Sequence, residues 1–227
     1  MSAKLSFQPF NEQGNVRVYY NGFLPHWRQA GCSYFVTFRL ADSVPKKVID
    51  QWKYERDAWL KARGIDPFRT GMEHKFAKLS RSEQLTFERY FTGKLFQFLD
   101  QGYGACYLRD PVACKIAFDA LLHFHGQRIE AGDLVVMPNH VHVLMTPLPG
   151  HELEEVLHSI KSFTANQINR HFKRTGVLWM EESHDHIVRD AEELIRIQRY
   201  IANNPIKARL KQNEYLQSDA NYDLSQQ

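Results

Sequence analysis

The sequence predicts an α+β protein with a ferredoxin-like β-α-β-β-α-β order, an antiparallel sheet, a helical insertion after the first strand and a C-terminal helix carrying a tyrosine. Residues 32–40 are rich in β-branched and aromatic side chains, which is typical of a strand. Two apolar runs at 128–137 and 140–146, separated by two residues, predict a hairpin. Helical patterns follow the first strand (from Asp110) and the hairpin (153–174), and a short strand near 186–189 completes the order.

The chain is expected to divide into three parts. Residues 1–29 lack a clean periodicity and are expected to be an irregular lead-in. Residues 30–210 are expected to form one domain, with a helical insertion at about 45–105 that holds a helix at 46–62, a loop at 63–79 and a helix opened by Ser80 and Glu83 in a capping-box pattern. Residues 211–227 form a polar tail.

The composition is that of an ordinary globular protein with a mild basic excess. Of 227 residues, 43% are hydrophobic and 24% are charged, and the formal net charge of +3 is compatible with a nucleic-acid partner. Three cysteines without metal-ligand spacing argue against a disulfide framework. Because there is no secretory leader pattern and no apolar run near ~20 residues, we expect a cytoplasmic protein without a membrane partner.

The most informative motif is a pair of histidines on the second strand of the expected hairpin. Side chains alternate across a strand, so His140 and His142 share one face. Two imidazoles on one face can chelate a metal ion. The alternative is a pair of half-buried histidines that are satisfied by hydrogen bonds, and the pair alone leaves both interpretations open.

A second motif lies on the last helix, which is expected to begin at Ala191. Tyr200 and Asn204 are four residues apart and therefore lie on the same helix face, and Pro205 is expected to end the helix at Asn204. A phenol beside an amide oxygen offers a nucleophile and a third metal ligand. The alternative is a tyrosine at the edge of the core followed by an asparagine cap.

Four blocks of the chain resemble a known family. They are 31–40 (GCSYFVTFRL), 136–144 (VMPNHVHVL), 157–165 (LHSIKSFTA) and 200–208 (YIANNPIKA). In this order they resemble the REP-associated tyrosine transposases, a branch of the HUH-type single-strand DNA transposases (HUH endonucleases). The resemblance spans roughly residues 24 to 210.

The resemblance implies a role for each matching residue. His140 and His142 match the family's metal ligands, Asn204 matches the third, amide-type ligand, and Tyr200 matches the nucleophile. It further implies Mg²⁺ or Mn²⁺ as the cofactor, and single-stranded DNA beside a palindromic hairpin as the substrate. DNA transposition and recombination would proceed through a 5′-phosphotyrosine. Relatives also place the tyrosine helix in a partner subunit's site, so the resemblance admits a homodimer with either a cis or a trans arrangement.

Three basic residues are candidate DNA contacts. Lys161 and Arg170 lie on the polar side of the 153–174 helix, and Lys207 follows the Tyr200 motif. For all three, the alternative is an ordinary solvated charge.

A second His-x-His pair, His184 and His186, is a weaker candidate for metal or DNA contact because it lacks a matching third ligand. Asp185 between them fits the family pattern, but the sequence indicates no role for it.

Three functions remain open from the sequence. The first is a transposase that cuts and rejoins single strands. The second is a non-catalytic single-strand or hairpin DNA-binding protein derived from such a transposase. The third is a metal-dependent hydrolase with another substrate, which would release product without a covalent adduct and would bind substrate with little salt dependence.

Overall fold

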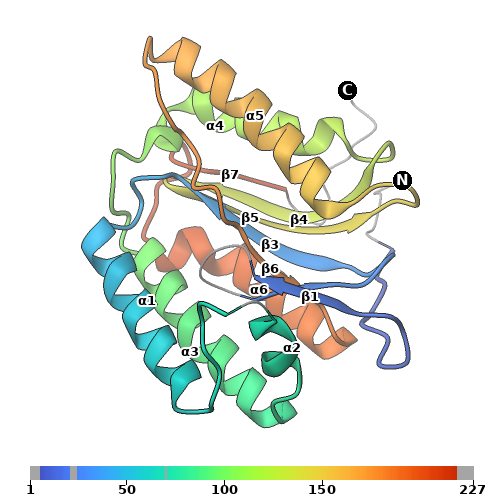
Figure 1. Ribbon diagram of the computed structural model, residues 1–227. Helices are drawn as coiled ribbons and strands as arrows, with labels where there is room; N and C mark the ends of the chain where they lie inside the picture. Colours follow the sequence, from blue (N-terminus) through green and yellow to red (C-terminus); the bar gives the residue numbers. More distant parts are fainter. Residues whose placement is uncertain (1–5, 21–24, 70, 219–227) are drawn as a thin grey trace.

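A five-stranded antiparallel sheet forms the centre of the molecule in the computed structural model, which describes residues 6–20, 25–69 and 71–218 (Figure 1). The strand order is β6-β3-β5-β4-β7. The strands are β3 (Tyr34–Arg39), β4 (Ile129–Met137), β5 (His140–Pro147), β6 (His184–Ile187) and β7 (Leu216–Gln217).

The expected β-α-β-β-α-β order is confirmed. Helix α4 (Pro111–His123) connects β3 to β4, and α5 (Leu153–His171) connects β5 to β6. The four main strands take the spatial order fourth, first, third and second, in which every neighbouring pair is antiparallel. This is the ferredoxin-like arrangement.

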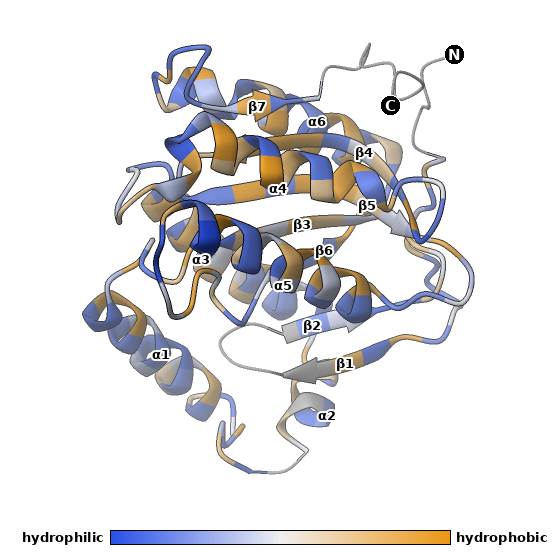
Figure 2. Ribbon diagram, turned by 90° about the horizontal axis from the view of Figure 1, so that it is seen from above, coloured by the Kyte–Doolittle hydropathy of each residue, from blue (hydrophilic) through white to orange (hydrophobic). Residues whose placement is uncertain are grey.

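Helices α4 and α5 cover one face of the sheet. Their apolar sides pack on strand residues that alternate with those of the other face, including Val36, Phe38, Val141 and Val143. Figure 2, viewed from this side, shows hydrophobic and hydrophilic residues alternating along both helices, as expected for amphipathic helices that bury one side.

The opposite face of the sheet carries α6 (Ala191–Lys207) and lies toward the helical insertion (Figure 1). The insertion consists of α1 (Lys46–Lys61), α2 (Met72–Ala77) and α3 (Arg81–Leu99). On this face the core is smaller and combines strand residues with α6. Its fully or nearly buried members are Phe35, Val135, Met137, Leu144, Val188, Ile197 and Ile201.

Polar side chains fix where three of the helices begin. The Asp110 carboxylate accepts hydrogen bonds from the backbone N–H groups of Val112 and Ala113, and Pro111 occupies the first turn of α4. Ser80 and Glu83 form the expected capping box of α3. Asp190 caps α6 by accepting from the N–H of Glu193.

The lead-in differs from the sequence expectation. It is not wholly irregular, because β1 (Arg17–Tyr20) and β2 (Pro25–Arg28) form an antiparallel hairpin that extends from the β6 edge (Figure 2). The side chains of His26 and Arg28 are buried against Asp185 of β6. A strand that buries a polar face lacks the alternation of apolar residues by which strands are recognised in a sequence.

Two shorter elements were also unexpected. Helix α2 occupies part of the expected loop at 63–79, where its Phe76 is buried with Phe87 and Phe91 of α3. Residues of the polar tail form β7, which pairs Leu216 with Val136 of β4. Beside the backbone pairing, Ser218 Oγ accepts from the Leu134 N–H at 2.9 Å, and so short a strand leaves no periodic signal in the sequence.

None of the helices in the described part of the chain combines the length and the hydropathy needed to cross a bilayer. Cys32, Cys106 and Cys114 are buried and free.

Candidate active site

The two histidines of the first motif meet at their ring edges on the α6 side of the sheet. His140 and His142 are both fully buried, and their Nε2 atoms lie 3.0 Å apart. The shared face follows from the two-residue period of β5. Both rings are buried because α6 and the insertion helix α3 cover this side of the sheet.

A hydrogen bond with a nearby side chain orients each ring. Asn139 Nδ2 donates to the backbone carbonyls of Leu99 (3.3 Å) and Tyr103 (3.1 Å), so its Oδ1 is the atom left to accept from His140 Nδ1, at 2.7 Å. This assigns the proton of His140 to Nδ1 and leaves a lone pair on Nε2. The Thr37 hydroxyl lies 2.7 Å from His142 Nδ1 and can donate or accept there.

The buried imidazoles are neutral. Burial lowers the pKa of His140 to about 3. Burial also lowers the pKa of His142 well below its usual value, and the neighbouring His140 and His184 contribute to the same shift. A neutral imidazole with a free Nε2 lone pair is the form that binds a metal ion.

The second motif lies against this pair within the same chain. Tyr200 Oη is 3.4 Å from His142 Nε2, and the two rings have centroids 5.1 Å apart. Asn204 lies one helical turn further on, only 1% exposed, and neither its amide oxygen nor its amide nitrogen has a hydrogen-bond partner within the described residues. The chain therefore brings phenol, imidazoles and amide together in cis.

Helix α6 does not end at Asn204 as the sequence predicts. It includes Pro205 and continues to Lys207. A proline this close to the end of a helix removes one backbone N–H donor without displacing several turns. The extra turn keeps Asn204 in helical geometry, on the same face as Tyr200.

The insertion supplies a wall of the site that the sequence analysis missed. The ring of Phe96, on α3, stacks on Tyr200 with centroids 5.7 Å apart and planes at 21°, and its edge meets His142 at 5.3 Å. Asp100, which caps the end of α3, forms a 2.5 Å ion pair with Lys207. Burial raises the pKa of Tyr200, the negative charge of Asp100 raises it further, and the interaction of the phenol with the Asn204 side chain lowers it by a smaller amount.

The three candidate DNA contacts are divided between the two faces. Only Lys207 lies on the helix that carries Tyr200. Lys161 and Arg170 lie on α5, which packs on the opposite face of the sheet. Lys161 Nζ donates to the Glu181 carbonyl at 2.6 Å, and burial lowers its pKa to about 8. The structure therefore does not bring Lys161 or Arg170 to the tyrosine.

The second histidine pair has a different environment from the first. His184 pairs with Thr37 across β6 and β3, and its Nε2 lies 3.1 Å from the Thr92 hydroxyl of α3. His186 Nδ1 lies 2.7 Å from Glu88. Among the described residues no cluster of three or more His, Cys, Asp or Glu side chains could hold a metal ion.

The structure gives Asp185 a structural role. It projects to the α5 side, where its carboxylate accepts from Arg28 and lies 2.7 Å from His26 Nδ1. These contacts join the β1–β2 hairpin to β6.

Comparison with known proteins gives one family match. Residues 118–204 match the family described as "Transposase IS200 like". The matched segment includes both metal-ligand candidates, the tyrosine and the asparagine. The segment that carries all or part of three of the four sequence motif blocks is therefore similar to the IS200-like transposases.

Two solved structures are distantly similar to the chain. One is a REP-associated tyrosine transposase bound to a REP hairpin, at 16% identity and a TM-score of 0.40, covering 83% of this chain and 72% of that one. The other is a provisionally assigned transposase of Deinococcus radiodurans R1, at 15% identity and a TM-score of 0.30, covering 86% and 97%. No curated protein matches the chain.

Proposed function

We propose that this chain is a metal-dependent tyrosine transposase that cleaves and rejoins single-stranded DNA beside palindromic hairpins. The observation that carries the proposal is the placement of the Tyr200 phenol 3.4 Å from a pair of neutral, fully buried imidazoles. A tyrosine held at the edge of the core for packing alone does not require two oriented histidines beside it. The match to the IS200-like transposase family supports the same function.

The donor atoms fit a divalent cation. A metal–nitrogen distance of about 2.1 Å and a bond angle near 90° place two ligand nitrogens about 3 Å apart, which agrees with the 3.0 Å between the Nε2 atoms. The unpartnered oxygen of Asn204 supplies a hard third ligand. Two imidazoles and one amide oxygen leave coordination positions open for phosphate and water, which suits Mg²⁺ or Mn²⁺.

The ion would supply positive charge that polarises the scissile phosphate. The residues of the chain do the remaining work. The Tyr200 oxygen forms a bond to phosphorus while the bond from phosphorus to the 3′ oxygen breaks; the phenol loses its proton and the 3′ oxygen gains one. The products are a 5′-phosphotyrosine and a free 3′-hydroxyl.

Retention of the phosphodiester in a covalent link favours strand transfer over hydrolysis. Another 3′-hydroxyl can attack the phosphotyrosine and rejoin strands without a further energy source. Thr37 and Asn139 hold the two rings in place, and Phe96 holds the plane of the phenol.

The proposal is tested with labelled single-stranded DNA that carries a hairpin, incubated with the protein and Mn²⁺ and resolved on a denaturing gel. We expect a covalent band with the wild type and none with Tyr200→Phe, while hairpin binding stays within about twofold because only a hydroxyl is removed. DNA binding without any adduct would favour the non-catalytic alternative. An adduct retained by Tyr200→Phe would exclude Tyr200 as the nucleophile.

A further inference from the structure

The helical insertion carries the positive charge of the chain. Residues 45–105 hold 12 of the 29 Lys and Arg but only 8 of the 26 Asp and Glu, which gives them a formal net charge of +4. The rest of the chain therefore has a net charge of −1, and the whole chain reaches +3. A basic excess that is confined to one part of a protein indicates a surface for a polyanion.

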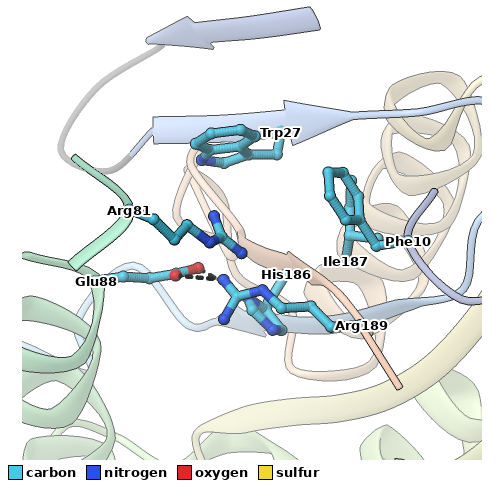
Figure 3. A pocket seen from close by; sticks show the side chains of 7 residues that line it. All are labelled: Phe10, Trp27, Arg81, Glu88, His186, Ile187 and Arg189. Carbon is cyan, nitrogen blue, oxygen red and sulfur yellow. Dashed lines mark hydrogen bonds and ion pairs between the residues drawn. The ribbon is translucent and has the colours of Figure 1, made fainter. Parts of the chain in front are cut away.

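Most carboxylates of the insertion are engaged in ion pairs. Figure 3 shows Glu88 of α3 directed toward Arg189, which donates to it at 3.0 Å and so joins α3 to the residues that follow β6. Further ion pairs join Glu55 to Lys94, Asp57 to Arg56, Glu83 to Arg63 and Asp100 to Lys207. The basic excess of the insertion is therefore left to its other lysines and arginines.

One side of α1 faces away from the rest of the molecule. Helix α1 lies at the periphery in both Figure 1 and Figure 2, and its Trp52 and Leu60 pack inward with residues of α3. Exposed residues recur on the other side at intervals of three or four, so they form one continuous surface, the α1 face. The α1 face consists of Lys47, Gln51, Tyr54, Ala58 and Lys61. At 1.5 Å per residue it is about 21 Å long.

The α1 face is positively charged. Lys47 and Lys61 form no hydrogen bond or ion pair with any described residue. Lys46 and Lys53 are exposed along one margin of the face, and Asp50 is exposed between them. Four lysines and one carboxylate leave a net charge of +3 on the face and its margin.

Two exposed aromatic rings accompany these lysines. Tyr54 lies on the α1 face between Lys47 and Lys61 and is 71% exposed, and within the described part of the chain its ring has no hydrogen bond or ring contact. Phe68, which follows α1, is 76% exposed, and Lys61 Nζ lies 5.7 Å from the centre of its ring. Aromatic rings set among unpaired cations are the pattern by which proteins hold unpaired bases and their phosphates.

We infer that the α1 face binds single-stranded DNA, with phosphates paired to Lys47 and Lys61 and bases stacked on Tyr54 and Phe68. A single strand fits better than a duplex, because the bases of a duplex are stacked on one another and do not reach the two rings. The contact is independent of sequence, since every base has a face that can stack.

The inference rests on the proposed function, which brings single-stranded DNA to Tyr200. Helix α3 lies between the two sites: its Phe96 stacks on Tyr200, and its Lys94 pairs with Glu55 of α1. Because packed helices have axes about 8–10 Å apart, a few nucleotides of the same strand span the distance around α3. The α1 face would thus hold the flank of a strand whose scissile phosphate lies at Tyr200.

The test measures binding of a fluorescent oligodeoxythymidine of about 20 nucleotides by anisotropy between about 50 and 200 mM salt. All variants are made in the full-length protein with Tyr200→Phe, so that no strand is cleaved. The double variant Lys47→Gln, Lys61→Gln should reduce the slope of log affinity against log salt by about 1.4, the effect of two lost phosphate contacts. It should weaken binding about tenfold at about 200 mM salt and more at about 50 mM.

The matched control is the double variant Lys115→Gln, Lys173→Gln. Both lysines are exposed, and they lie on α4 and directly after α5, the helices that cover the other face of the sheet. The control removes the same charge from the protein and should change the affinity by less than about threefold.

The base contact is tested by a separate variant. Tyr54→Ala should lower the affinity for the single strand about tenfold with an unchanged salt slope, whereas Tyr54→Phe keeps the ring and should stay within about twofold. Because Tyr54 is 71% exposed and alanine favours helices, neither variant disturbs the packing of α1. Affinity for a duplex of the same length should not change in Tyr54→Ala. An equal loss for the single strand and the duplex would overturn the stacking contact.

The outcomes separate this inference from the proposed function. If the wild type forms the covalent adduct and the Lys47, Lys61 variant binds DNA as the control variant does, the inference about the α1 face is overturned and the transposase proposal stands. If the wild type forms no adduct but the Lys47, Lys61 variant loses affinity and salt dependence as expected, the α1 face binds DNA and the catalytic proposal fails. If polyglutamate competes as well as the oligonucleotide, the α1 face binds acidic chains in general and the inference is overturned.

Discussion

Replacing Thr37 by valine tests whether the hydroxyl beside His142 prepares the ion site. Valine keeps the shape and the β-branch of threonine on β3 but removes the hydroxyl that lies 2.7 Å from His142 Nδ1. Thr37 is 2% exposed and His142 is fully buried, so water cannot replace the lost contact. The ring nitrogen is then left unsatisfied, at a cost of about 1–3 kcal/mol.

The same loss should appear in ion binding. Removing the hydrogen-bond partner of a histidine ligand typically weakens metal affinity about 10- to 100-fold. We expect Thr37→Val to weaken Mn²⁺ binding by this factor, measured from the electron paramagnetic resonance signal of free Mn²⁺ during a titration. Thr37→Ser restores the hydroxyl and should bind within about threefold of the wild type.

A matched control separates orientation from general stability. Thr146 lies on the same strand as His142, and its hydroxyl is 2.7 Å from that of Ser33 in an equally buried pair. Thr146→Val should lose a similar free energy of unfolding and leave Mn²⁺ affinity unchanged. Equal Mn²⁺ affinity in Thr37→Val and the wild type would refute the orienting role of Thr37. Equal weakening of Mn²⁺ binding in Thr37→Val and Thr146→Val would show that the loss comes from the lower stability of the fold.

Three further outcomes are expected. His142→Ala should abolish the metal-dependent adduct and lower the free energy of unfolding by about 2 kcal/mol, because the ring is buried; an adduct that survives excess chelator would contradict the metal assignment. Phe96→Ala should lower the free energy of unfolding by about 3 kcal/mol in urea titrations and slow adduct formation at saturating DNA. An unchanged rate of adduct formation would show that the Phe96 ring does not position Tyr200. Burial alone would lower the pKa of His26, but its hydrogen bonds to Asp185 and Glu182 raise it to about 9. This stabilisation of about 3 kcal/mol is complete below pH 6.5 and is lost as the pH rises through 9. In His26→Gln, the free energy of unfolding should no longer fall between pH 6.5 and 9, and a fall equal to that of the wild type would contradict the ion pair.

The order of the sheet could be predicted because each of its main strands carries its own local signal. The apolar runs around His140 and the amphipathic pattern of α5 follow from periods of two and 3.6 residues. These local periods do not show which elements cover each face of the sheet. Whether His140 is exposed depends on α6 and α3, which lie far away in the sequence.

The sequence motifs indicate the side chains that meet at the candidate site, the proposed ligands and nucleophile, but not the side chains that support them. His142 and Tyr200 stand in short motifs whose spacing already implies a shared face. Phe96 lies in α3, whose aromatic residues occur on several sides of the helix, so its sequence marks no single contact face. Asn139 could have been found, since it adjoins His140 and its side chain can accept from a neighbouring ring.

The division of the proposed catalytic groups between a helix and a sheet has a mechanical consequence. Tyr200, the proposed nucleophile, and Asn204, the proposed amide ligand, both lie on α6, whereas His140 and His142 lie in β5. A DNA end covalently joined to Tyr200 would move with α6 if the helix shifted. The hydrogen bonds between the strands of the sheet would not need to break. A tilt of α6 against the fixed sheet could thus present the covalently joined DNA end to an incoming strand.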